Sequence, residues 1–265
     1  MGTGATASYI RAVLRHAPAN LVSLIRFALI ALVILFLVPI AVSATRYWLR
    51  ADGDWRSADR SSAGLLPPAE TNPGAVVRIY SARTVSWRGI VATHSWIVIK
   101  GSGERRYRRF DYTAWGQPIW IDRFVPDGRW FGNAPETVFA TDGPEAEMML
   151  PRIRKAVAEY RYARPGDYVV WPGPNSNTFV AAVMAAVPEM RASLPATAIG
   201  KDFPYDGRWI GRTPSGTGIR INLGGYVGLT FAWVEGLELN LLGGVAGIDF
   251  RRPGIKLPAI GRLGI

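Results

Sequence analysis

The fold of the main domain is decided by residues 93–100, which read Thr-His-Ser-Trp-Ile-Val-Ile-Lys. These β-branched and aromatic residues are typical of a buried strand. Gly101-Ser102-Gly103 then provides a turn, and residues 105–112 alternate well enough to pair back across it. We therefore predict an antiparallel hairpin, with a further strand at residues 75–80.

Two helices are predicted to pack on this sheet. The first starts at residues 142–145, where Asp, Pro and Glu form a helix-start signal, and its apolar residues recur at helical spacing to about Tyr162. A short strand is predicted at residues 168–171, and a second helix at about residues 178–187, ended by Pro188. The predicted fold class is α+β, an antiparallel sheet with packed helices.

The rest of the chain divides around this domain, which we place at residues 72–215. Residues 46–71 mix Ala, Asp, Ser, Gly and Pro and are interpreted as a linker. Residues 216–265 are interrupted by glycines and are expected to form two or three hairpin strands. We interpret them as a Gly-rich β extension packed on the same domain.

Residues 27–45 are nineteen residues without charge, dominated by Leu, Ile, Val, Ala and Phe. This length crosses a bilayer core as a helix. Residues 1–26 carry arginines and no acid, so the positive-inside rule places them in the cytoplasm. We expect a single-pass protein of the cell inner membrane with a periplasmic C-terminal domain.

Two alternatives compete with this membrane anchor. The first is a cleaved signal peptide, because Val42-Ser43-Ala44 places small residues where a signal peptidase cleaves. The second is a buried core helix. The long N-terminal segment and the length of the apolar run favour a retained anchor.

Composition limits the partners. A formal net charge of +11 favours anionic partners, and lipid headgroups, cell-wall polymers and nucleic acid all qualify. Residues 105–110 interleave arginines with aromatics, but export argues against nucleic acid. Anionic lipid or a cell-wall polymer remain candidate partners, while a charged edge strand is the structural alternative. No oligomeric state is predicted.

The absence of cysteine excludes disulfides, thiolate metal sites and a cysteine nucleophile. With His94 the one histidine of the exported part, no metal or cofactor is implied.

Ser176 is the candidate nucleophile, because it follows a Gly/Pro-shaped loop at the start of the second helix. Unpaired amides and the positive end of the helix dipole gather there, so Asn175 and Asn177 mark a candidate oxyanion site. Asn and Ser are also preferred N-cap residues. Capping without chemistry is therefore the alternative interpretation of all three residues.

His94 is the candidate base for Ser176, because a serine hydroxyl needs a neighbouring base to react. Asp111, on the paired strand, is our first choice for the group that orients the imidazole, ahead of Tyr112 and Asp202. A packed or hydrogen-bonded histidine without catalytic function is the alternative.

The order of these segments resembles the circularly permuted papain-like fold, which contains lecithin retinol acyltransferase-like proteins and NlpC-type cell-wall peptidases. There a histidine on a strand precedes a nucleophile at a helix N-terminus, and Thr93–Trp96 and Asn175–Phe179 match those positions. The nucleophile in that family is cysteine, and this chain has Ser176 instead.

Residues 171–179 and 198–202 resemble more closely an uncharacterised bacterial family of membrane-associated proteins, known as domain of unknown function 3750. That resemblance implies a location and no activity. The sequence thus favours a membrane-anchored envelope hydrolase or acyltransferase acting on an amide or ester. The competing hypothesis is a catalytically inactive envelope-binding module.

Overall fold

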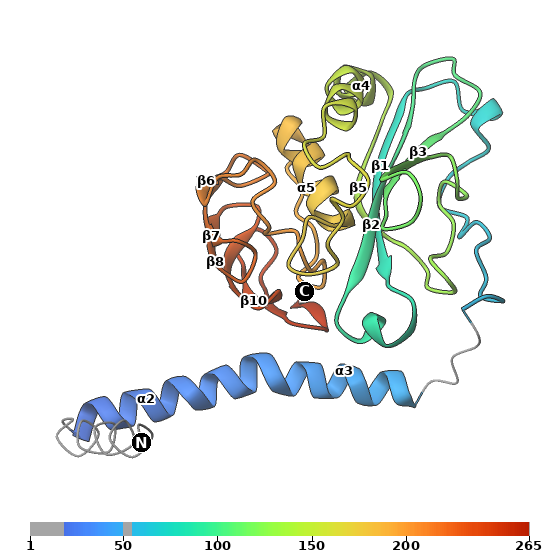
Figure 1. Cartoon of the computed structure of the whole chain (residues 1–265). Coiled ribbons are helices and arrows are strands. Elements are labelled where there is room, and N and C mark those ends of the chain that lie inside the picture. Colours follow the sequence, from blue (N-terminus) through green and yellow to red (C-terminus); the bar gives the residue numbers. More distant parts are fainter. Residues whose placement is uncertain (1–18, 50–54, 265) are drawn as a thin grey trace.

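The fold is α+β, as predicted, with two antiparallel sheets and a helix, α5 (Ser176–Ala186), between them (Figure 1). A computed structural model describes residues 19–49 and 55–264. The first sheet has the strand order β4-β3-β2-β1-β5. Its strands are β1 (Val76–Arg83), β2 (Thr93–Lys100), β3 (Arg108–Tyr112), β4 (Ile119–Ile121) and β5 (Glu136–Asp142).

The predicted hairpin is confirmed, because β2 pairs antiparallel with β3 and Ile97 lies opposite Phe110. Every residue of β2 is buried, since both faces of the sheet are covered. On one face Ile97 and Ile99 join a core with α5 and α4 (Gly143–Ala158). On the other face Trp96 and Val98 pack in a smaller cluster.

Both predicted helices are confirmed. α4 follows Asp142 in its N-cap position and buries Met149, Ile153 and Val157 against the sheet. α5 begins at Ser176, two residues earlier than expected, because Asn175 caps it. Short 3₁₀ turns lie at Ala69–Thr71, Ser86–Ile90 and Pro188–Met190.

The predicted strand at residues 168–171 is wrong. This segment forms bends without strand pairing, and it leads into two cis peptide bonds, Trp171-Pro172 and Gly173-Pro174. The amide of Val169 donates to the carbonyl of Pro174 at 2.8 Å, so the segment satisfies its backbone within its own loop. Because the Val169 amide is bonded within the loop, it is not available to a neighbouring strand.

The C-terminal sheet has seven strands in sequence order, more than the two or three hairpin strands predicted. Its strands are β6 (Ile210–Arg212), β7 (Gly218–Leu223), β8 (Val227–Ala232), β9 (Gly236–Leu241), β10 (Gly244–Asp249), β11 (Gly254–Leu257) and β12 (Gly261–Gly264). Tight turns make this possible, because Gly224, Gly225 and Gly243 adopt positive φ and reverse the chain within a few residues.

The N-terminal segment is one apolar helix, composed of α2 (Ala19–Leu32), a π-helical turn η1 (Val33–Leu37) and α3 (Val38–Trp48). Residues Leu21–Trp48 make 28 helical residues, long and apolar enough to cross a membrane. This helix extends beyond the uncharged residues 27–45 at both ends. It lies along one side of the domain (Figure 1), and Ser43 Oγ donates to the carbonyl of Ile90 at 2.6 Å.

Candidate functional site

Four of the five predicted site residues line one cavity of about 480 Å³: His94, Asn175, Ser176 and Asn177. β2 contributes His94, and the start of α5 contributes the other three. Most other lining residues are aromatic or aliphatic, among them Trp115, Trp130, Tyr168 and Trp171. The fold thus brings residues 82 positions apart to the same apolar cavity.

Asp111, the fifth predicted residue, lies behind His94. Its Oδ1 is 2.9 Å from His94 Nε2. Arg109 donates to both of its carboxylate oxygens, from Nε at 2.7 Å and from Nη2 at 2.9 Å. All three side chains are buried. They form a continuous hydrogen-bonded chain, Arg109–Asp111–His94, that ends at the cavity.

The strand geometry explains this chain. Residues two apart on a strand point to the same face, so Arg109 and Asp111 lie side by side on β3. The paired register of β2 and β3 ends at Ile97 and Phe110, and Asp111 is the next residue of β3 towards His94. The i, i+2 spacing of Arg109 and Asp111 was the sequence signal for this pair, and our sequence reasoning missed it.

The electrostatics within the Arg109–Asp111–His94 hydrogen-bonded chain keep Asp111 ionised and His94 neutral. Burial raises the pKa of Asp111, but the Arg109 charge and the His94 hydrogen bond outweigh it and hold that pKa below its usual value. Burial lowers the pKa of His94, against the opposing effect of Asp111. Since a carboxylate accepts hydrogen bonds, the imidazole proton lies on Nε2, which leaves Nδ1 as the basic nitrogen.

Aromatic packing fixes the imidazole ring. The Trp130 ring stacks on His94 with centroids 3.8 Å apart and planes 10° apart. The Arg109 guanidinium lies 4.1 Å from the ring centroid of Trp96, and its Nη1 also donates to the carbonyl of Val125 at 2.7 Å. The base and its partners are therefore held in one arrangement before any ligand binds.

Asn175 caps α5. Its Oδ1 accepts from the amides of Asn177 and Thr178, and the Thr178 hydroxyl accepts from the Asn175 amide in return. Its Nδ2 donates to the carbonyls of Val170 and Ile199, both at 3.0 Å. The capping role that sequence offered as the alternative is thus present for Asn175.

Asn177 ties α5 to β2. Its Nδ2 donates to the carbonyls of Thr93 and Ile199 at 2.9 and 2.8 Å, and its Oδ1 accepts from Ser95 at 2.8 Å. Its backbone amide is already bonded to Asn175. Every polar group of its side chain therefore has a partner within the protein.

Ser176 contacts a residue that sequence reasoning missed. The Tyr168 hydroxyl lies next to the Ser176 amide and side chain; burial raises the pKa of Tyr168, and these contacts lower it in part. Among the described residues, no hydrogen bond joins His94 to Ser176. Tyr168 immediately precedes the loop before α5, but no sequence spacing singled it out.

The two other candidates for the orienting group have other partners. Tyr112 lines the same cavity, and its ring packs on Tyr160 at a centroid distance of 5.2 Å. Asp202 contacts Lys201 and Asn240 near the second sheet. Of the three, Asp111 is the one that contacts His94.

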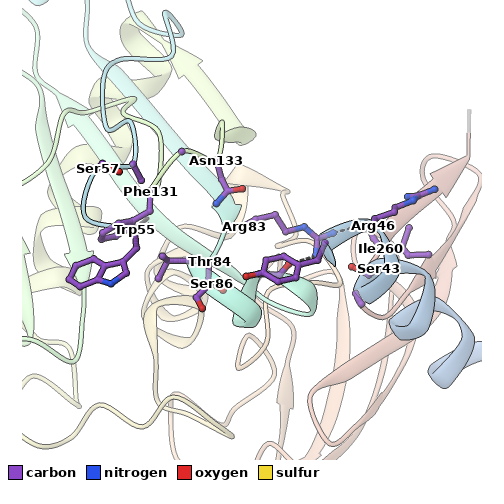
Figure 2. Close-up of a pocket in the computed structure, with 16 residues that line it drawn as sticks. Ser43, Arg46, Trp55, Ser57, Arg83, Thr84, Ser86, Phe131, Asn133 and Ile260 are labelled. Atoms are coloured by element: carbon purple, nitrogen blue, oxygen red, sulfur yellow. Dashed lines mark hydrogen bonds between the residues drawn. The ribbon is translucent and has the colours of Figure 1, made fainter. Parts of the chain in front are cut away.

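A second cavity, of about 640 Å³, lies between the end of α3 and the domain. Figure 2 shows Ser43 and Arg46 from the helix opposite Arg83 and Ser86. None of the predicted site residues lines it. Across residues 19–49 and 55–264, no group of three His, Asp or Glu side chains is placed to hold a metal ion.

Comparison with known proteins gives one family. Residues 74–203 match the family model described as "Protein of unknown function (DUF3750)". This part of the chain belongs to that family. The matched segment contains the Arg109–Asp111–His94 chain and Ser176, and it ends before β6. No curated protein and no solved structure matches the chain.

Proposed function

We propose that this protein is a membrane-anchored hydrolase or acyltransferase of the cell envelope, acting on an amide or ester through Ser176. The observation that carries the proposal is the buried Arg109–Asp111–His94 chain, which ends at the cavity that Ser176 lines. Buried ionic groups of this kind, next to an apolar cavity, are typical of functional sites.

In the proposed reaction His94 Nδ1 accepts the proton of Ser176 Oγ while Oγ bonds to the substrate carbonyl carbon. The proton then passes to the leaving amine or alcohol. Water releases the acyl group in a hydrolase, and another nucleophile accepts it in an acyltransferase. Asp111 holds Nε2 protonated and stabilises the transient imidazolium, and Arg109 keeps Asp111 ionised. Catalytic hydrogen bonds often tighten only with substrate bound. Because Trp130 and Asp111 fix His94, the proposal requires the Ser176 side chain to turn towards it in that complex.

The oxyanion would be stabilised by the Ser176 amide and the Tyr168 hydroxyl, provided that the substrate oxygen replaces the contact between these two groups. The Asn177 amide is engaged by the cap, so it contributes through the helix dipole rather than by a direct hydrogen bond. Tyr168 then has a specific role, because its hydroxyl already lies beside the Ser176 amide.

The location and ancestry in this proposal rest on the N-terminal helix and the order of the site residues. The helix Leu21–Trp48 anchors the chain in the inner membrane as a single span, and the domain lies in the periplasm. A histidine on a strand followed by a hydroxyl at a helix N-terminus supports a permuted papain-like ancestry.

The test is active-site labelling of the full chain with a fluorophosphonate probe, followed by mass spectrometry of the modified peptide. Label on Ser176 that is lost in Ser176→Ala and in His94→Ala supports the proposal. Ser102→Ala is the matched control, because Ser102 is exposed on a turn and its hydroxyl bonds to Glu147, so labelling persists. A folded native protein that takes up no label refutes an activated serine.

A second candidate is a catalytically inactive envelope-binding module. The capping bonds of Asn175 and the contact of Ser176 with Tyr168 favour it, because they give this segment a structural role. The exposed Arg105 and Arg106 would then bind anionic lipid or a cell-wall polymer. Loss of sedimentation with anionic vesicles or isolated cell wall in Arg105→Gln/Arg106→Gln, with no labelling of Ser176, supports this candidate.

A further inference from the structure

The C-terminal sheet has inverted amphipathic strands. In β7, β8 and β9 the exposed positions are Ile, Leu, Val or Phe, and the buried positions include Arg220, Thr230, Glu238 and Asn240. A sheet with one face in water shows the reverse alternation, with polar residues outward. The pattern therefore indicates an apolar environment outside the sheet.

The outward apolar side chains form a continuous surface, which we call the outer face. One row crosses six strands through paired neighbours: Ile219, Phe231, Leu237, Ile248, Ile255 and Leu263. All six are more than a third exposed, and Phe231 is 62% exposed. Seven strands at their usual spacing span roughly 30 Å. Soluble monomers rarely expose an apolar patch of this extent without a partner.

The inward side chains form a buried ionic network instead. Glu238 contacts Lys201 and Lys256, in each case at 2.5 Å, and Lys201 also contacts Asp202 at 3.0 Å. Lys256 lies two strands from Glu238, with Gly247 between them in the register. Burying charges costs free energy even when they are paired. The charged side chains of the sheet nevertheless point inward against the domain, while the exposed positions of β7, β8 and β9 are apolar.

The apolar N-terminal helix reaches this sheet. Within Leu21–Trp48, Phe36 is one of two buried residues, and a Cβ atom added to Gly244 at the start of β10 would lie 3.5 Å from Phe36 Cδ1. In Figure 1 α2 continues past this point on the side where the sheet lies. Hydrocarbon that surrounds the helix would therefore also reach the outer face.

Aromatic residues border the outer face. Tyr226 and Trp233 stand at the two ends of β8, and Trp209 precedes β6; all three are exposed. Tyr and Trp are enriched where protein crosses from hydrocarbon to headgroups, since their rings are apolar and carry one polar group.

We propose that the outer face of the C-terminal sheet contacts the lipid bilayer and holds the domain against the membrane. The occupant is the apolar part of the same bilayer that the N-terminal helix enters, so this inference rests on the anchoring proposed above. The domain then has two membrane contacts, a spanning helix and the outer face of the sheet beside it.

The chain contains no cysteine, so single cysteines can be spin-labelled in the full protein. The protein is reconstituted into vesicles of phosphatidylethanolamine and phosphatidylglycerol. Phe231→Cys and Leu239→Cys probe the outer face. Met148→Cys, exposed on α4, is the aqueous control, and Leu29→Cys on α2 tests the anchor. All four side chains are exposed, so folding is preserved.

Collision rates are measured with oxygen, which concentrates in the bilayer, and with a water-soluble nickel chelate. We expect both outer-face labels to gain oxygen collisions and lose nickel collisions on reconstitution, and the label at position 148 to remain aqueous. Outer-face labels that behave like position 148 overturn the inference. Outer-face labels that are shielded from both reagents, with spectra broadened by dipolar coupling between labels, overturn the inference and indicate a second copy of the chain on this face. The label at position 29 reports the anchor separately, so failure of the anchoring is distinguishable.

Discussion

Replacement of Asp111 by asparagine tests the charge balance of the buried Arg109–Asp111–His94 hydrogen-bonded chain. The replacement amide keeps the size of the side chain and can still accept from His94 Nε2. It removes the charge that neutralises Arg109, whose guanidinium is buried and otherwise meets the Val125 carbonyl and aromatic faces. Asp111→Asn therefore leaves an uncompensated buried cation.

Breaking a buried pair in this way costs about 3–5 kcal/mol. The matched control is Asp142→Asn, because Asp142 also accepts two hydrogen bonds from an arginine, Arg78, but its carboxylate is 57% exposed. Water screens that pair, so the control costs about 1 kcal/mol or less.

The assay is urea unfolding of the full chain in detergent micelles, followed by tryptophan fluorescence. Trp96 and Trp130 report directly, because both pack against Arg109 or His94. The midpoint of Asp111→Asn should fall well below that of Asp142→Asn. Equal midpoints for the two variants would refute the claim that Arg109 depends on Asp111 for its charge balance.

Further predictions follow from the same contacts. The unfolded chain protonates His94 near its ordinary pKa of 6.5, whereas the native protein protonates it only at lower pH, so the free energy of unfolding should fall as pH drops below 6.5. Urea titrations at several pH values should show that His94→Gln removes this pH dependence. An unchanged pH dependence in that variant contradicts the assignment to His94. Glu238→Gln leaves Lys256 and Lys201 short of a counter-charge and should cost about 3–5 kcal/mol in the same assay; a neutral effect would show that the network is unimportant. Asn177→Ala removes three buried hydrogen bonds and should cost about 3 kcal/mol, whereas a loss below about 1 kcal/mol argues against a bracing role.

Local patterns were enough to predict three strands of the first sheet, at residues 75–80, 93–100 and 105–112, and the two helices packed on it, but not β4 and β5. The hairpin of residues 93–112 has a turn and alternation within twenty residues, and α4 carries its own start signal and apolar spacing. The signals for these elements are local, so they can be read from the sequence even though distant residues such as Asn177 also contact β2.

The segments predicted wrongly depend on how a loop folds or on very short strands. Residues 168–171 have strand-like composition, but their backbone bonds within the loop that follows. The C-terminal strands are only three to six residues long, and the glycines between them resemble breaks rather than turns. Their inverted amphipathic pattern was visible, but only the register shows that the apolar residues form one surface.

The candidate site was predictable in part. Residue type and position pointed to His94, Asp111 and Ser176. Arg109 was assigned to a charged edge because residues 105–110 read as one basic run, yet its side chain is buried and Arg105 is exposed. The contact between Tyr168 and Ser176 depends on how the loop folds, so no spacing predicts it.

The most direct test of the account is the pH dependence of fluorophosphonate labelling at Ser176. If His94 is its base, the labelling rate should rise with pH along a single titration whose midpoint lies below 6.5, because burial lowers the pKa of His94. His94→Gln should lose both the rate and this titration. A labelling rate that is independent of His94, or of pH over this range, would contradict the assignment of His94 as the base.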